Sequence, residues 1–176
     1  MLLGMTRRAG FTLIEVLTTI TIMVILLTLS VVTLSVYQAN SRDEERKTDV
    51  ATIAAQLEDF YQTDQQISPN TFTNGTYPST TAMNSEANIK TSLPDLDPRA
   101  LRDPATPTTS SVSLIVASSA STPTLASLNS GKTYIYQPLD ASNALCTTVS
   151  QECVKFNLYY TLETDATIKT ITSKHQ

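Results

Sequence analysis

A long uncharged segment near the N-terminus constrains this chain more than any other feature. From Val16 to Ser41 no residue carries a charge, and most of the side chains are apolar. An uncharged, mostly apolar window of about 18 or more residues is a candidate membrane-spanning helix. As a helix this segment extends about 39 Å, which exceeds the hydrocarbon thickness of a bilayer, about 30 Å. A purely cytosolic globular protein is therefore not expected.

The residues before the apolar segment predict its orientation. Arg7 and Arg8 precede it, and positive charge on this side predicts a cytoplasmic N-terminus and an external C-terminus. A secretory signal peptide has an apolar region of only about 7–15 residues that ends at a small-x-small cleavage site. Here the region is longer, and Tyr37-Gln38-Ala39 lacks that pattern. An ordinary signal anchor is the other interpretation, and neither of the two explains Glu15.

Glu15 places a carboxylate at the apolar entry of the segment, where a charge is costly and implies a partner. A cut between Gly10 and Phe11 would create an α-amino group four residues away, about 6 Å of helical rise from Glu15. Its pKa of about 8 keeps such an amine largely cationic at neutral pH. Carboxylate and ammonium could then neutralise each other, within one subunit or between adjacent ones.

Arg-Arg-Ala-Gly at 7–10, followed by Phe-Thr-Leu-Ile-Glu-Val-Leu at 11–17, resembles the class III signal of type IV pilins and pseudopilins. The resemblance implies that a prepilin peptidase cuts after Gly10 and that the new terminal amine of Phe11 is methylated. It also implies that Glu15 sets the register of assembly and that Arg7 and Arg8 supply the charge of the leader. Many members of the family have a proline, often with a glycine, inside the apolar helix, and residues 11–65 have neither.

The resemblance implies an α+β protein with the type IV pilin fold, in which a long N-terminal helix packs on a small antiparallel sheet. The expected parts are a leader at 1–10, counted from Met1 with Met5 as the alternative start, a membrane-spanning and filament-core half-helix at 11–41, and a soluble head at 42–176. Within the head we expect an amphipathic helix at 42–63, a loop region at 64–111 and the sheet at 112–176. The helical stripe that predicts the second part of the helix consists of Val50, Ile53, Ala54, Leu57 and Phe60 or Tyr61.

The local pattern predicts further elements of the head. The charge run at 42–49 favours a solvated helix face, with Asp43 and Lys47 paired four residues apart. Turn residues dominate from Ser68 to Pro107, with a short helix expected at 81–92 and a turn at 99–102. Strands are expected at 112–117, 133–137, 153–163 and 167–172, and their tyrosines as sheet core.

Two cysteines, Cys146 and Cys153, lie close together in the sequence of the expected external head. In an exported domain such a pair favours a disulfide, with two reduced thiols as the alternative. A loop this short would contribute about 2–3 kcal/mol in the chain-entropy model. The Ser- and Thr-rich stretches at 105–111 and 118–123 are expected to be exposed, with O-linked sugars as one interpretation. Asn74-Gly75-Thr76 is better explained as a turn.

No catalytic constellation is visible in the sequence, so an enzyme is not expected, and neither is a cofactor or a metal site. The single histidine, His175, has no histidine or cysteine at ligand spacing. Asp95, Asp97 and Asp103 are explained by turns more simply than by calcium. The net charge of −4 and the pI of about 4.9 disfavour a large nucleic-acid-binding surface.

The predicted function is therefore that of a structural filament subunit, held in the cytoplasmic membrane as a prepilin and then assembled into a cell-surface or envelope filament. The resemblance implies several partners: further copies and minor pilins, the peptidase and methyltransferase, an assembly ATPase, a membrane platform protein and membrane lipid. Adhesion, motility, DNA uptake by a competence pilus and secretion by a pseudopilus remain open, as does the choice between major and minor subunit. The alternative is an unprocessed single-pass membrane protein with an extracellular binding domain.

Overall fold

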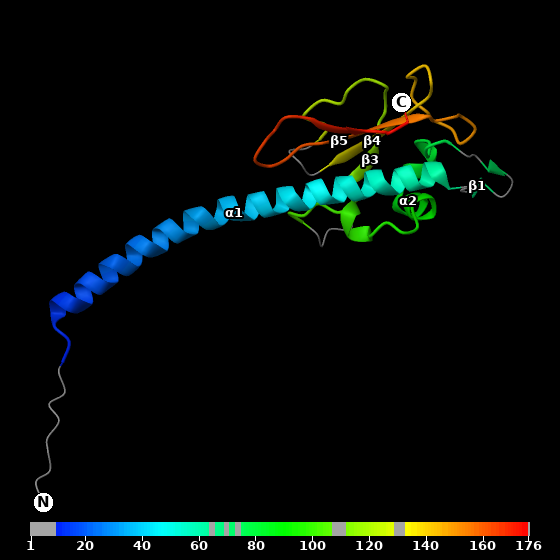
Figure 1. The fold of residues 1–176 in the computed structure, drawn as a ribbon. Coiled ribbons are helices and arrows are strands. Elements are labelled where there is room, and N and C mark those ends of the chain that lie inside the picture. The colour runs from blue at the N-terminus through cyan, green and yellow to red at the C-terminus, as the bar shows by residue number, and fades with distance from the viewer. Residues whose placement is uncertain are drawn as a thin grey trace, which may run out of the picture. The chain divides into compact units, whose positions relative to one another are not determined.

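The structure is a computed structural model that describes residues 10–63, 66–68, 71–72, 75–106, 112–128 and 133–175. The chain divides into two compact units, residues 1–38 and residues 39–176. One helix, α1 (Leu13–Gln62), supplies residues to both units (Figure 1). Of the elements that the structure describes, the second unit contains every helix after α1 and every strand, and we call this unit the head.

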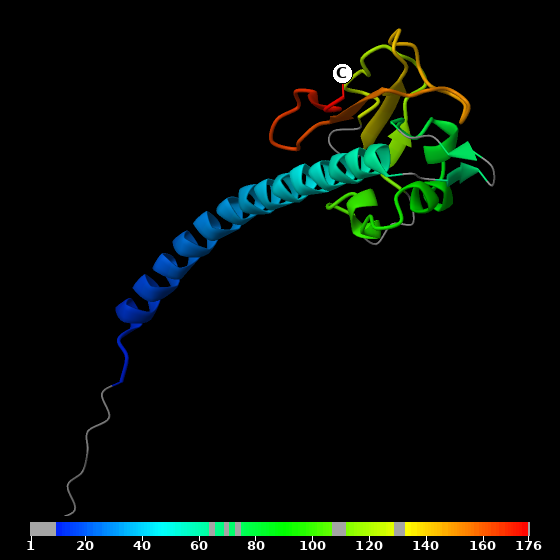
Figure 2. The ribbon, with the colours of Figure 1, turned by 45° about the vertical axis from the view of Figure 1, so that its right-hand side comes forward.

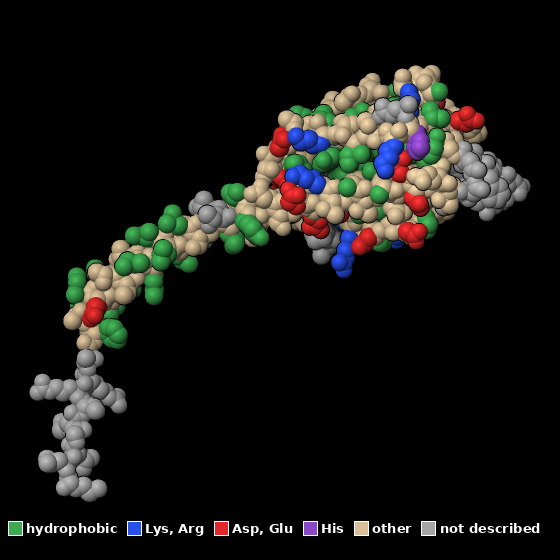
Figure 3. Space-filling view, in the orientation of Figure 1, with side chains coloured by type: hydrophobic (Ala, Val, Ile, Leu, Met, Phe, Trp, Pro, Cys, Tyr) green, Lys and Arg blue, Asp and Glu red, His purple; other side chains and the backbone are tan. Residues whose placement is uncertain are grey.

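The part of α1 within the first unit is an apolar helix whose side chains at 13–30 and 34–38, where the structure describes them, are all exposed. By length and composition it can cross a membrane, with a mean hydropathy of 2.4 over its best window. Large side chains such as Met23 and Leu27 are each 68% exposed, and Figure 3 shows apolar side chains on the visible face of this unit. The hydroxyls of Thr21 and Ser30 donate to the carbonyls of Leu17 and Leu26, so these polar groups are satisfied inside the helix.

The part of α1 within the head is amphipathic, as its sequence predicts. Val50, Ile53 and Leu57 are fully buried, and Ala54 and Phe60 flank them in the same core. In Figures 1 and 2 the sheet lies on one side of this half of α1, while α2 (Glu86–Ser92) and its neighbouring turns lie on the other. The observed helix bounds agree with the expected helix at 11–63 to within two residues.

The sheet of the head has four strands in the order β3 (Leu114–Val116), β4 (Tyr134–Leu139), β5 (Lys155–Tyr160) and β6 (Lys169–Thr172). The β4–β5 and β5–β6 pairs are antiparallel, but β3 runs parallel to β4. The predicted α+β class is confirmed, and the sheet is mixed where the prediction had an antiparallel one. A parallel neighbour requires a crossover connection, and the segment between β3 and β4 makes it.

Strand β4 is buried on both faces, which its alternating sequence does not predict. Its inner face carries Tyr136, fully buried in the main core. On its outer face Ile135 packs with Leu128 and Tyr159 in a second, smaller cluster. Gln137, also on β4, is completely buried under the crossover loop. In Figures 1 and 2 this yellow-green loop lies over the sheet on the side away from α1.

The connection between α1 and β3 holds more structure than its turn-rich sequence indicates. The short helix expected at 81–92 is present in two pieces, η1 (Thr81–Met83) and α2, and Ser85 caps α2 by accepting from Asn88 N. The turn expected at 99–102 is η2 (Pro98–Leu101), a single 3-10 turn that follows Asp97. A hairpin of β1 (Gln66–Ser68) and β2 (Thr71–Phe72) was not predicted.

Candidate functional site

The first turn of α1 brings Thr12 and Glu15 together. Thr12 N donates to Glu15 Oε2 over 3.1 Å, and Glu15 N donates to Thr12 Oγ1 over 3.3 Å. The hydroxyl of Thr12 also donates to Glu15 Oε2 at 3.0 Å. These reciprocal bonds form a capping box, which satisfies two of the backbone donors that a helix start leaves unpaired.

The capping box gives Glu15 a partner within its own helix. The partner predicted for this carboxylate is a terminal amine, not Thr12, although Thr-x-x-Glu before an apolar run is a recognisable signal for the box. A role for Glu15 in assembly therefore has to be separated experimentally from its role in starting the helix. Glu15 itself is exposed in the single chain, so it is accessible to a neighbour.

The expected cleavage bond lies in an accessible segment just before the helix. Gly10 is exposed, and Phe11 is 87% exposed. A Cβ added at Gly10 would meet no atom of the described chain within 4 Å. Nothing in the described part of the chain therefore requires glycine at this position, so a requirement for glycine would come from the processing enzyme. Arg7 and Arg8, the expected leader charges, lie outside the described residues.

A buried ion cluster lies where α1 enters the head, and we call it the Arg46 cluster. Arg46 is fully buried and donates to three carboxylates: Asp43 at 2.9 Å, Asp103 at 3.0 Å and Glu163 at 2.7 Å. Arg42 reaches Glu163 at 2.6 Å. The cluster thereby ties α1 to the segment before β3 and to the β5–β6 connection, which are distant in sequence.

Asp43 is the second buried anchor of the Arg46 cluster. It accepts from Glu163 N at 2.8 Å, from Thr164 N at 3.0 Å and from the Thr164 hydroxyl at 2.6 Å. Burial disfavours its charged form, but the bonds from Thr164, Glu163 and Arg46 outweigh burial and lower the pKa of Asp43 below its usual range. This carboxylate therefore stays ionised and holds the β5–β6 connection against α1.

These contacts correct two predictions about the charge run at 42–49. The expected solvated face is wrong for Asp43 and Arg46, which are 2% and 0% exposed. The expected Asp43–Lys47 pair is also wrong, because Lys47 bonds to Glu44 at 2.7 Å while Asp43 turns inward. Charged residues at helical spacing indicate a solvated face only when no distant partner covers them, and here Asp103, Glu163 and Thr164 are such partners.

Glu58 on α1 holds the residues near the C-terminus by hydrogen bonds. This buried carboxylate accepts from the Tyr77 hydroxyl at 3.0 Å and from Lys174 N at 2.8 Å. His175 Nε2 lies 3.6 Å from Glu58, and its ring stacks on Tyr61 with the centroids 4.1 Å apart. Among the residues that the structure describes, no group of three His, Cys, Asp or Glu side chains is placed to hold a metal ion.

Cys146 and Cys153 are both buried and are free thiols in the structure. Cys153 Sγ donates to Gln151 O at 3.6 Å, and burial raises the pKa of both thiols. Their backbone carbonyls accept from Thr80 N at 3.0 Å and from Tyr77 N at 2.7 Å, so both cysteines hold the same neighbouring segment. Each thiol also contributes to the pKa shift of the other, so the two lie near each other, and the disulfide stays a prediction.

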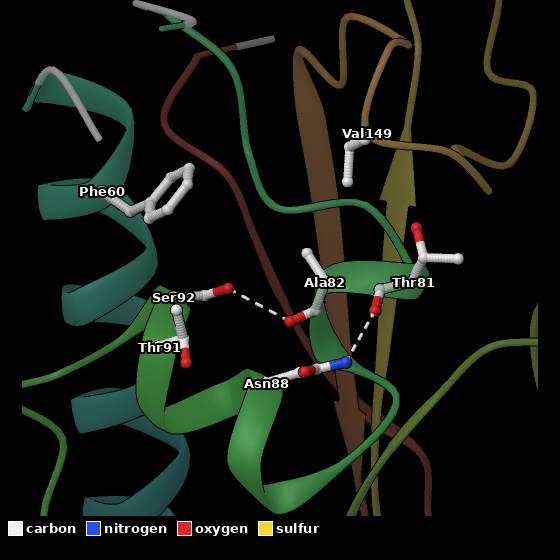
Figure 4. A pocket seen from close by; sticks show the side chains of 7 residues that line it. All are labelled: Phe60, Thr81, Ala82, Asn88, Thr91, Ser92 and Val149. Carbon is white, nitrogen blue, oxygen red and sulfur yellow. Dashed lines mark hydrogen bonds between the residues drawn. The ribbon is translucent and has the colours of Figure 1, made fainter. Parts of the chain in front are cut away.

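A pocket of about 190 Å³ opens where the end of α1 meets η1 and α2 (Figure 4). Ser92 Oγ donates to Ala82 O at 3.1 Å, and Asn88 Nδ2 donates to Thr81 O at 3.2 Å. These donors tie α2 to η1, and no lining residue is charged. The pocket therefore offers no acid, base or nucleophile activated by a neighbouring base for catalysis.

Fold and site together define an α+β protein with an exposed apolar N-terminal helix and an accessible segment before it. Residues 5–31 match the model of the prokaryotic N-terminal methylation motif. This match contains Gly10, Phe11 and Glu15, and it confirms the resemblance to the signal of type IV pilins and pseudopilins. Searches of curated proteins and of solved structures found no significant match.

Proposed function

We propose that the chain is a structural subunit of a type IV pilus or pseudopilus filament. In this proposal the prepilin is inserted in the cytoplasmic membrane with its N-terminus inside, cut after Gly10 and methylated at Phe11. An assembly ATPase and a membrane platform protein then transfer it into a filament of identical subunits and minor pilins. The observation that supports this most strongly is the methylation motif at residues 5–31, which lies directly before the exposed apolar helix.

The exposed side chains of the apolar helix explain how one segment serves two environments. Phe11 and Leu13 are more than four-fifths exposed, and every residue of this unit whose burial the structure describes is exposed. In a bilayer these apolar side chains contact lipid tails and are removed from water. In a filament the same side chains would pack against the helices of neighbouring subunits and form a dry core, at about 25 cal/mol per Å² of apolar surface buried.

Glu15 gives the proposed assembly its register. When an incoming subunit places its methylated Phe11 amine near an exposed Glu15, the carboxylate and the ammonium neutralise each other in apolar surroundings. Any other axial position leaves the Glu15 charge without that partner, which is unfavourable in a low-dielectric core. This is the step of the proposal that a substitution tests most directly.

The test compares Glu15→Ala with Glu15→Gln in cells that make the filament. Glutamine can replace glutamate in the capping box, so Glu15→Gln keeps the helix start and loses only the charge. We expect both variants to insert into the membrane and to be processed, and we expect both to lower the yield of sheared filaments at least tenfold. Normal filament number and length with Glu15→Gln would show that the box alone matters and would reject the register role.

The alternative function is an unprocessed single-pass membrane protein with an extracellular binding domain. It shares the apolar helix and the external head, but it requires the peptide bond between Gly10 and Phe11 to stay intact. It also gives Glu15 no role beyond the capping box. The state of the N-terminus therefore separates the two functions.

We also propose that Cys146 and Cys153 form a disulfide once the head reaches an oxidising external compartment. Both cysteines accept backbone hydrogen bonds from the segment 77–80, and each thiol contributes to the pKa shift of the other, which supports this proposal. In the chain-entropy model the closed loop contributes about 2–3 kcal/mol. Alkylation of the unreduced, denatured protein should then leave both cysteines unmodified, and labelling of both would reject the disulfide.

A further inference from the structure

One stretch of the head has no charged residue. Between Asp103 and Lys132 the sequence contains no Asp, Glu, Lys, Arg or His, although 16% of the whole chain is charged. Serine and threonine are frequent in this stretch, and prolines interrupt it. Uncharged sequence rich in Ser, Thr and Pro is typical of segments that carry O-linked sugars. Composition alone does not define a site, but the structure supplies three further observations for residues 118–122.

The first observation is that the backbone of this segment is held against the sheet by a buried amide. Gln137 Nε2 donates to Ser119 O at 2.9 Å and to Ser121 O at 3.0 Å. Gln137 Oε1 accepts from Asn157 Nδ2 at 2.9 Å and from the Tyr159 hydroxyl at 3.1 Å. Every donor and acceptor of this amide side chain is therefore used, and the loop is fixed on β4 through its carbonyls.

The second observation is that the hydroxyls of the segment are left free for other partners. Ser118, Ser119, Ser121 and Thr122 are all exposed. Within the described part of the chain, none of their hydroxyls makes a hydrogen bond. They lie on a rigidly held loop, so a transferase could reach them without unfolding the head.

A second group of exposed hydroxyls, in the cysteine loop, provides a contrast. The hydroxyls of Thr147 and Thr148 both donate to Gln151 Oε1, at 3.3 and 3.4 Å. Thr148 and Ser150 also share a hydrogen bond of 3.2 Å. These side chains are exposed as well, but their hydroxyls are engaged within the loop. Both groups are therefore exposed, but of the two, within the described part of the chain, only the hydroxyls of the segment 118–122 are free of hydrogen bonds.

The third observation is an apolar hollow directly beside the segment. It has a volume of about 390 Å³ and lies between the loop and β3, with Ile115, Pro123 and Ile135 among its lining residues. Ile115 is 44% exposed, and Leu125 in the same loop is 51% exposed. A pyranose ring has an apolar C–H face and a polar rim, so it can cover such a surface and present hydroxyls to water.

We propose that the segment 118–122 is a site of O-linked glycosylation. A seryl or threonyl oxygen attacks the anomeric carbon of a sugar activated as a nucleotide- or lipid-linked phosphate. The new glycosidic C–O bond forms as the bond from the anomeric carbon to the phosphate oxygen breaks, and the hydroxyl proton passes to a base of the transferase. No oxidation or reduction is involved. The attached sugar ring then lies next to the apolar hollow.

The test uses the full chain isolated from the cells that make it, both from the membrane and from filaments. Trypsin cuts after Arg102 and Lys132, so one peptide contains the whole uncharged stretch. Mass spectrometry should find this peptide heavier by whole hexose or N-acetylhexosamine units, and electron-transfer fragmentation should place them at 118–122. The modification does not depend on the state of Phe11, so this test and the test of filament assembly can fail independently.

Matched variants complete the experiment. The combined replacement of Ser118, Ser119 and Ser121 by Ala with Thr122→Val should remove the sugar mass from the peptide. The control replaces the engaged hydroxyls with Thr147→Val, Thr148→Val and Ser150→Ala, and it should leave the sugar mass unchanged. An unmodified peptide in the native chain, sugars placed only outside 118–122, or phosphate in place of sugar would each overturn the proposal.

Discussion

Asp49 is a half-buried carboxylate on the head portion of α1, with the Tyr134 hydroxyl 3.4 Å from its Oδ2. Burial and the negative charge of nearby Glu45 raise its pKa from 3.8 to about 6, with a smaller contribution from Asp97; the Tyr134 bond and Arg46 oppose the rise. The folded head therefore binds this proton more tightly than the unfolded chain does. The stability that comes from neutral Asp49 is fully present below about pH 4 and is lost as the pH rises through about 6.

Asp49→Asn should remove this dependence, because asparagine is neutral at every pH. We expect the variant to be more stable than the native chain by about 1 kcal/mol near pH 8, a figure reduced for solvent screening at a partly exposed group. Near pH 4 the two should be equally stable. Thermal unfolding in detergent, followed by near-ultraviolet circular dichroism of the buried tyrosines, measures both. Equal stability at both pH values would contradict the raised pKa.

At the residue scale, sequence spacing alone predicts the roles of Gly10, Phe11 and Glu15, because the signal is local and short, and the methylation motif at residues 5–31 contains all three. The same local pattern could also have revealed Thr12 as the partner of Glu15 in the capping box. Arg46 could not be recognised as a buried hub, because its partners Asp103 and Glu163 are 57 and 117 residues away. Judged only from the sequence of its own helix, Arg46 looks like any solvated charged residue.

At the scale of elements, the Arg46 cluster is the contact that ties α1 to the β5–β6 connection. Arg46→Met should destabilise the head by about 3–5 kcal/mol, because it leaves Asp43 and Asp103 buried without their cation. The unfolding midpoint of the full chain in detergent, again from the tyrosine signal, measures this loss.

Lys47→Met is the matched control on the same helix. Lys47 and Glu44 are both well exposed, and exposed pairs of this kind contribute about 0–1 kcal/mol. We expect little change in the midpoint for this variant. A similar loss for both variants would show that the Arg46 cluster contributes no more than surface charge.

The helices and strands were largely predictable, because the periodicity of apolar residues can be recognised within a short stretch of sequence. The long helix, the short helix near 81–92 and the four strand positions all follow from such windows. The parallel pairing of β3 with β4 did not, since it depends on a crossover loop that a buried side chain, Gln137, holds over the sheet. The hairpin of β1 and β2 also lay in a segment whose composition indicates only turns.

At the scale of the whole molecule, the chain combines two units with different requirements. The apolar part of α1 exposes its side chains at 13–30 and 34–38, where the structure describes them, whereas the head buries its apolar residues and pairs its buried charges. Such a helix needs lipid or other helices around it, and the proposed assembly supplies first the lipid of the membrane and then the helices of the filament. In this proposal the exposed first turn of α1, which contains Glu15, leaves the membrane and enters the core of the filament.

The most direct test of this account is the mass of the N-terminal peptide of the full chain, extracted from membranes and from sheared filaments. The account predicts a chain that begins at Phe11 and carries one methyl group on its α-amino nitrogen, in both fractions. Gly10→Ala should still be cut in part, whereas a bulkier residue at this position should block the cut. A native chain that retains the residues before Phe11 would contradict the filament proposal and favour the unprocessed membrane protein.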